Sequence, residues 1–67
     1  MNDLLTILIP VRNEKENVHI VTDEIQKKIK NSNFEILFIN DYSEDNTKEE
    51  LEKICKLNPN IFYHENN

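Results

Sequence analysis

The sequence predicts an α/β fold in which three parallel strands alternate with two helices. Two short apolar runs, and the start of a third, have the length and the β-branched content of buried strands. The two segments between these runs repeat apolar residues at helical spacing. Strands that alternate with helices pair in parallel, and the helical crossovers between them are right-handed.

The first predicted strand covers residues 4–9 and ends at Pro10, because proline has no N–H for the strand ladder. A helix is then predicted over residues 14–30. Asn13 is a favourable N-cap residue, and Glu16 has the spacing of a capping box with it. The apolar positions of this helix recur at Val18, Val21, Ile25 and Ile29.

A turn over residues 31–33 leads into the second predicted strand, residues 34–39. This strand is apolar and rich in β-branched and aromatic side chains, as buried strands of parallel sheets are. The polar segment 40–46 follows it and is predicted to be a loop. The second strand therefore lies between two polar connections.

The second helix is predicted to begin at Thr47, which forms a second capping-box pattern with Glu50. Asn58 and Pro59 end it, and residues 61–63 begin a third strand. The apolar stripe of this helix consists of Leu51, Ile54, Cys55 and Leu57.

Both faces of the predicted sheet are apolar. Phe34, Ile36 and Phe38 alternate with Glu35, Leu37 and Ile39 along the second strand. Strands that step in one direction place both helices on one face, so the other face stays uncovered. We therefore expect residues 1–67 to be a partial domain, the N-terminal part of a larger α/β domain. The alternative is that the uncovered face is buried by self-association.

Composition excludes several classes of function. The 67 residues include no glycine, which excludes the glycine-rich phosphate loops. The formal charge of −5 argues against a nucleic-acid partner. No apolar run approaches the roughly 18 residues of a membrane helix, and no signal peptide is apparent. A single cysteine suits a reducing compartment, so we expect a cytoplasmic location for this segment, while the full protein could still be membrane-associated.

Ligands of open parallel sheets bind at the carboxyl ends of the strands. Residues 10–14 and residues 40–43 lie at that edge of the predicted sheet. They bring together a carboxylate from each loop, a guanidinium and two helix N-termini, which favour anionic groups. Such a site suits a nucleotide.

Two segments resemble the opening motifs of family 2 glycosyltransferases, which have the GT-A fold. Residues 5–17, LTILIPVRNEKEN, are similar to the first strand and loop of that family. Residues 34–47, FEILFINDYSEDNT, are similar to its second strand and its Asp-Gly-Ser-x-Asp-x-Thr loop. Within the family, these motif sequences most resemble those of the dolichol-phosphate mannosyltransferase-like branch. The resemblance covers nearly all of this chain but only the first part of such an enzyme.

The resemblance implies a nucleotide-sugar donor whose sugar passes to a lipid phosphate, a glycan or another acceptor. It implies that Asp41 hydrogen-bonds the base or the ribose. The family often has tyrosine at the position of Arg12, whose flat guanidinium could instead stack on the base. The family positions that line the nucleoside pocket correspond to Pro10, Arg12, Glu14, Ile39 and Asp41.

The chain departs from the family pattern in three ways. Tyr42 stands where glycine is common, so a positive φ there would be strained. Asn40 replaces a frequent first aspartate. In the family that this chain resembles, the Asp-x-Asp motif that holds Mg²⁺ or Mn²⁺ and the catalytic base lie beyond the third strand, and this chain contains no Asp-x-Asp. We therefore assign no catalytic residue and no metal ligand, and expect the chain to be inactive by itself.

Simpler interpretations stand beside these. Glu14 could merely favour the first turn of its helix. Cys55 fits a buried thiol, and the two histidines fit the surface. The whole chain could be a non-catalytic α/β fragment or interaction module; a paired-carboxylate hydrolase and a phosphorylatable receiver domain rank below both. Turn and capping chemistry would account for Ser43, Asp45 and Thr47.

Overall fold

The computed structural model describes residues 4–29 and 33–66. The predicted order of strands and helices is confirmed. The first helix ends at Lys28 rather than at the predicted residue 30, and Ile29 is already extended. Most of the turn predicted over 31–33 lies outside the described residues. The elements are β1 (Leu5–Val11), α1 (Val18–Lys28), β2 (Phe34–Asp41), α2 (Thr47–Leu57) and β3 (Ile61–Asn66).

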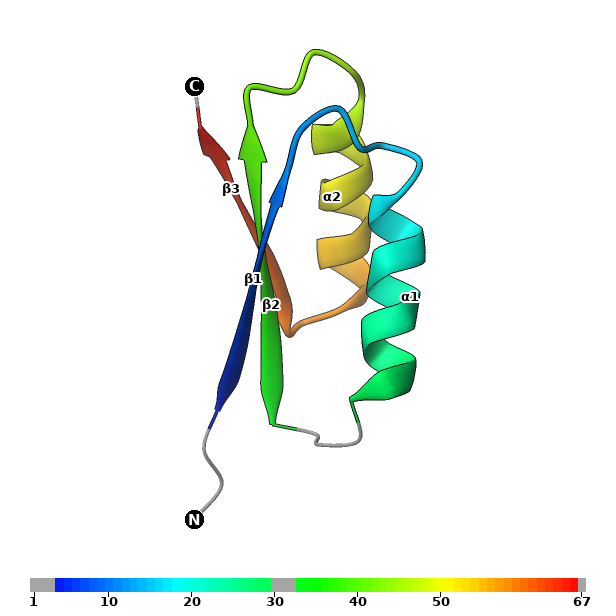
Figure 1. Cartoon of the computed structure of the whole chain (residues 1–67), viewed down its shortest axis with the longest axis vertical. Helices are drawn as coiled ribbons and strands as arrows, with labels where there is room; N and C mark the ends of the chain where they lie inside the picture. The colour runs from blue at the N-terminus through cyan, green and yellow to red at the C-terminus, as the bar shows by residue number, and fades with distance from the viewer. Residues whose placement is uncertain (1–3, 30–32, 67) are drawn as a thin grey trace.

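The three strands form one parallel sheet in the order β1-β2-β3. Because the strands step in one direction, both helices lie on the same face of the sheet, as predicted (Figure 1). Within the described residues, neither helix is long and apolar enough to cross a membrane.

The core lies between β2 and the two helices. Ile36 and Phe38 are completely buried, and α2 supplies Leu51 and Ile54 against them. Val18 closes the core from the start of α1. Full burial of each large apolar side chain contributes about 1.5–3 kcal/mol. The middle strand and the two helices therefore account for most of the hydrophobic stabilisation.

The opposite face of the sheet is uncovered. Leu8, Leu37 and Phe62 are ladder neighbours across the three strands and point away from the helices. Leu8 is 63% exposed and Phe62 is 48% exposed. We call this row the open-face row. It bears out the expectation that two helices leave one apolar face bare.

Pro10 does not end β1, because the strand continues to Val11. The N–H of Leu5 donates to the Asn33 carbonyl beside β2, so the backbone groups of alternate residues from Leu5 face that strand. The missing N–H of Pro10 therefore falls on the unpaired outer side of an edge strand, where proline is tolerated.

The predicted capping boxes are wrong. α1 begins at Val18 rather than Glu14, and neither helix has a side-chain hydrogen bond at its N-cap residue. A turn precedes α1, in which the N–H groups of Asn17 and Val18 donate to the Glu14 carbonyl. The Asn13 side chain does not cap α1, because its Oδ1 accepts a hydrogen bond from the Glu44 N–H in the loop between β2 and α2.

Candidate functional site

The two predicted site loops meet at one edge of the sheet. The loop after β1 leads into α1, and the loop after β2 leads into α2 (Figure 1). Parallel strands place both of their carboxyl ends on the same side, and the N-termini of both helices follow there. The arrangement predicted for a ligand site is therefore present in outline.

Hydrogen bonds join these loops directly. The Asn13 N–H donates to Ser43 Oγ at 2.9 Å, and Asn13 Oδ1 accepts from the Glu44 N–H at 2.7 Å. The Glu14 N–H donates to Thr47 Oγ1 at 3.0 Å. We call these three bonds the loop bridge. Each of them joins a backbone amide to a side-chain oxygen across the gap, so the bridge fixes the loop after β1 against the loop after β2 and the start of α2.

The bridge rests on a buried polar base. Asn40 is 1% exposed, and its Nδ2 donates to Glu65 Oε1 at 2.8 Å. Ser43 Oγ in turn donates to Asn40 Oδ1. A continuous chain of hydrogen bonds therefore runs from Asn13 through Ser43 and Asn40 to Glu65, across the carboxyl ends of all three strands.

Thr47 anchors the second connection. It is fully buried, and its hydroxyl accepts from Glu14 and donates to Asp45 Oδ1. The Thr47 N–H donates to the same carboxylate at 2.9 Å. These hydrogen bonds, the side-chain bond foremost, hold the pKa of Asp45 below its usual value against an opposing effect of burial. As predicted, Asp45 and Thr47 take part in turn and capping interactions, but here the Asp45 carboxylate is the acceptor for the Thr47 N–H and hydroxyl.

The residues predicted to line a nucleoside pocket lie on two sides of this edge. Pro10 and Ile39 are ladder partners, and with Asp41 they lie on the uncovered side of the sheet. Glu14 lies on the helix side. Arg12 is exposed and directly follows β1. Among the described residues, no hydrogen bond or ion pair engages the side chain of Arg12 or Asp41.

A cavity of about 290 Å³ lies between β1 and the start of α1. Most of its lining is apolar, and Glu14 and Asn17 are its polar members. Pro10 also borders it, so this residue adjoins both sides of the edge. Glu14 Oε2 accepts from Asn17 Nδ2 at 2.7 Å, which gives the carboxylate a structural role in the turn before α1 as well.

Among the described residues, Tyr42 and Asn13 have a positive φ. Tyr42, at the position where the family often has glycine, has φ 55°, and its side chain is exposed. Asn13 has φ 52°, which no local sequence pattern predicted. Asparagine adopts this conformation more readily than most residues. The sequence feature that indicates this conformation is an asparagine in a strand-to-helix loop of a chain that has no glycine.

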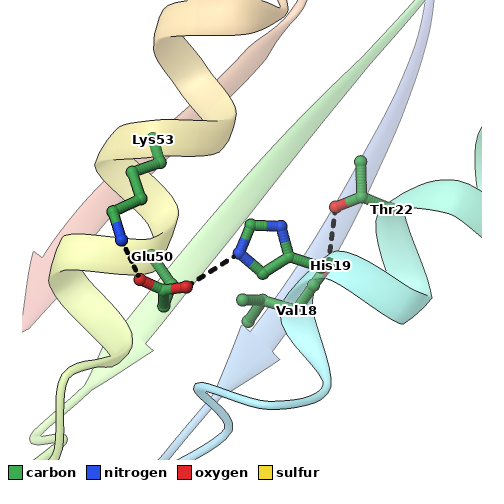
Figure 2. A network of polar contacts seen from close by, with 5 residues as sticks. All are labelled: Val18, His19, Thr22, Glu50 and Lys53. Carbon is green, nitrogen blue, oxygen red and sulfur yellow. Dashed lines mark hydrogen bonds and ion pairs between the residues drawn. The ribbon is translucent and has the colours of Figure 1, made fainter.

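A separate polar network joins the two helices on the surface, as Figure 2 shows. His19 Nε2 lies 3.0 Å from Glu50 Oε1, and Lys53 Nζ lies 2.9 Å from Glu50 Oε2. Lys53, and after it His19, hold the pKa of Glu50 below its usual value. In the same view, the buried Thr22 hydroxyl donates to the Val18 carbonyl. His19 is thus a surface residue, as predicted, with a carboxylate partner.

The described residues contain no group of three or more His, Cys, Asp or Glu side chains that could hold a metal ion. Cys55 is a partly buried free cysteine, and burial raises the pKa of its thiol. A reactive, thiolate-forming cysteine would need the opposite shift.

Comparison with known proteins identifies the family. Residues 6–67 match the family described as Glycosyl transferase family 2. The chain is 34% identical over 62 residues to the Bacillus subtilis (strain 168) protein named "Putative glycosyltransferase CsbB". That alignment covers 90% of this chain and 19% of the relative, so the chain spans about a fifth of the relative's length. The chain belongs to glycosyl transferase family 2.

Proposed function

We propose that this segment binds the nucleoside part of a nucleotide-sugar donor within a family 2 glycosyltransferase domain. The observation that carries the proposal is the meeting of the two family motifs at the carboxyl edge of a parallel sheet. In the proposal, Asp41 accepts hydrogen bonds from the base or ribose, and the Arg12 guanidinium stacks on the base. Pro10, Ile39 and Glu14 complete the pocket.

The complete enzyme would transfer the sugar to a lipid phosphate, a glycan or another acceptor. Family 2 enzymes typically use a divalent cation, Mg²⁺ or Mn²⁺, which would stabilise the departing diphosphate. The described residues do not fit such an ion. We therefore place its ligands, with the catalytic base, outside this chain, and assign the chain donor recognition alone.

The proposal also covers the place of the chain in its protein. Residues 1–67 would form one part of a larger domain, and the rest of that domain would cover the open-face row. The dolichol-phosphate mannosyltransferase-like branch and a cytoplasmic location, on the nucleotide-sugar side of any membrane, belong to the same proposal. The free cysteine suits that compartment.

The experiment is a titration of the purified chain with UDP, GDP and their sugars, with and without Mn²⁺. Asp41→Ala removes the proposed base or ribose acceptor, and Glu14→Gln removes the charge but keeps a hydrogen-bond acceptor for Asn17. Asp23→Ala is the matched control, because it removes one exposed carboxylate from α1 at no proposed contact. Circular dichroism of each variant checks the fold.

We expect one nucleoside diphosphate to bind in a manner that Asp41→Ala weakens at least about tenfold, the loss of one hydrogen bond to a charged group, and that Asp23→Ala leaves unchanged. Binding without Mn²⁺ is expected, since the nucleoside and not the diphosphate is recognised here. A folded chain that binds none of these nucleotides would refute the proposal and favour a non-catalytic interaction module.

A further inference from the structure

We infer that Asn13 is the positioning residue of the donor site, a role that rests on the proposed function. Its left-handed backbone and its side-chain oxygen together lock the Arg12–Glu14 segment against the β2–α2 loop. Asn13 would not touch the ligand. It would set the distance between the proposed ligand groups Arg12 and Glu14, which follow β1, and Asp41 at the end of β2.

The position of Asn13 in the chain lets it control how its neighbours are placed relative to Asp41. It lies between Arg12 and Glu14, and its bonds reach Ser43 and Glu44, which follow Asp41 closely. A change of backbone at Asn13 therefore moves both of its neighbours relative to Asp41. The bond from Ser43 to the buried Asn40 ties the same contact to the sheet.

The geometry demands two separate properties of the residue. First, the backbone has a φ of 52° in the conformation in which the Asn13 N–H donates to Ser43. Second, the side chain provides an oxygen that accepts from the Glu44 N–H. The Asp45 N–H also points to Asn13 Oδ1, at the longer distance of 3.4 Å. Both amides lie in the loop before α2, and Asn13 Oδ1 accepts from both of them.

Three substitutions separate the two properties. Asn13→Asp keeps an acceptor oxygen and tolerates the left-handed conformation. Asn13→Gly keeps the conformation and loses the acceptor. Asn13→Ala loses both. Ile25→Val, a mild core change on α1, serves as a control for lost stability, since Ile→Val in a core has a modest cost.

The test measures two quantities on the whole chain: the Kd for the nucleoside diphosphate and the hydrogen-exchange rate of the Glu44 amide. Both are measured near 0.15 M salt, where repulsion between the carboxylate introduced by Asn13→Asp and more distant exposed carboxylates is largely screened. We expect the Kd to increase, and binding therefore to weaken, in the order wild type, Asn13→Asp, Asn13→Gly, Asn13→Ala. Asn13→Asp should stay within about threefold, and Asn13→Ala should lose about tenfold, the loss that one hydrogen bond in a site can cause.

A merely structural role predicts a different pattern. Ile25→Val would then weaken binding as much as an Asn13 variant of equal thermal midpoint, and Asn13→Asp would bring no rescue; either result overturns the inference. Failure of the proposed function is distinguishable. If wild type binds no nucleotide, Glu44 exchange decides: faster exchange in Asn13→Gly with rescue by Asn13→Asp supports the lock, and equal rates in all variants overturn it.

Discussion

The left-handed conformation of Tyr42 predicts which of two substitutions at this position gives the more stable protein. This region costs a residue with a Cβ atom about 1–2 kcal/mol, a penalty that glycine escapes. Glycine, however, loses about 0.5–1 kcal/mol more than alanine in chain freedom on folding. At φ 55° the first cost exceeds the second. Tyr42→Gly should therefore be more stable than Tyr42→Ala by about 0.5–1 kcal/mol.

The comparison of two truncations removes the contribution of the aromatic ring, which is lost in both. In a domain of this size the difference corresponds to a thermal midpoint about 2–8 °C higher for the glycine variant. Urea unfolding followed by circular dichroism measures the free energy directly. The control is Lys48 in α2, an exposed helical position, where alanine should exceed glycine by about 1 kcal/mol.

The refuting result is equally definite. If Tyr42→Ala is as stable as Tyr42→Gly while the Lys48 pair behaves as stated, the loop does not hold residue 42 in the left-handed region in solution. The resemblance of this loop to one that carries glycine would then say nothing of its conformation.

Three further expectations follow from the packing and the charges. Phe38→Ala should lower the free energy of unfolding by about 3–5 kcal/mol, a large part of the roughly 3–10 kcal/mol expected for a chain of this length; near-wild-type urea unfolding would contradict this. The lowered pKa of Glu50 means that its stabilisation is present above the ordinary glutamate pKa of about 4.3 and is lost as pH falls through the lower folded value. The difference in thermal midpoint between wild type and Glu50→Gln should thus vanish in acid, and a pH-independent difference would refute the role of the pair. Finally, the exposed open-face row should make the thermal midpoint depend on protein concentration, and Leu8→Lys should remove that dependence; sedimentation of a strict monomer at all concentrations would count against it.

The fold could be predicted from local patterns because each element repeats its apolar residues with a clear period. Alternate burial of Ile36 and Phe38 against exposed Leu8 and Phe62 follows directly from strand geometry and from the number of helices. The helix starts could not be predicted in the same way. Capping boxes are patterns of neighbours in sequence, whereas Asn13 bonds to residues 30 and 31 positions away.

The polar base of the site was equally hidden from the sequence. Asn40 looked like an ordinary replacement for an aspartate, yet it is one of the few buried polar side chains described. Its importance comes from Glu65, which reaches it only because β3 pairs with β2 in a particular register. Burial and register are properties of the assembled sheet, so no local pattern contains them.

The division of the predicted pocket across two sides of the sheet edge constrains how a donor could bind. Asp41 and Ile39 lie on the uncovered side, Glu14 lies at the cavity on the helix side, and Pro10 borders both. A ligand confined to the cavity would respond to Glu14→Gln and not to Asp41→Ala, and a ligand on the uncovered side would do the reverse. Only a ligand that crosses the edge at Pro10 would respond to both. A nucleoside has two separable polar parts, base and ribose, so it suits such a divided site, and the loop bridge is then what keeps the two halves at one fixed separation.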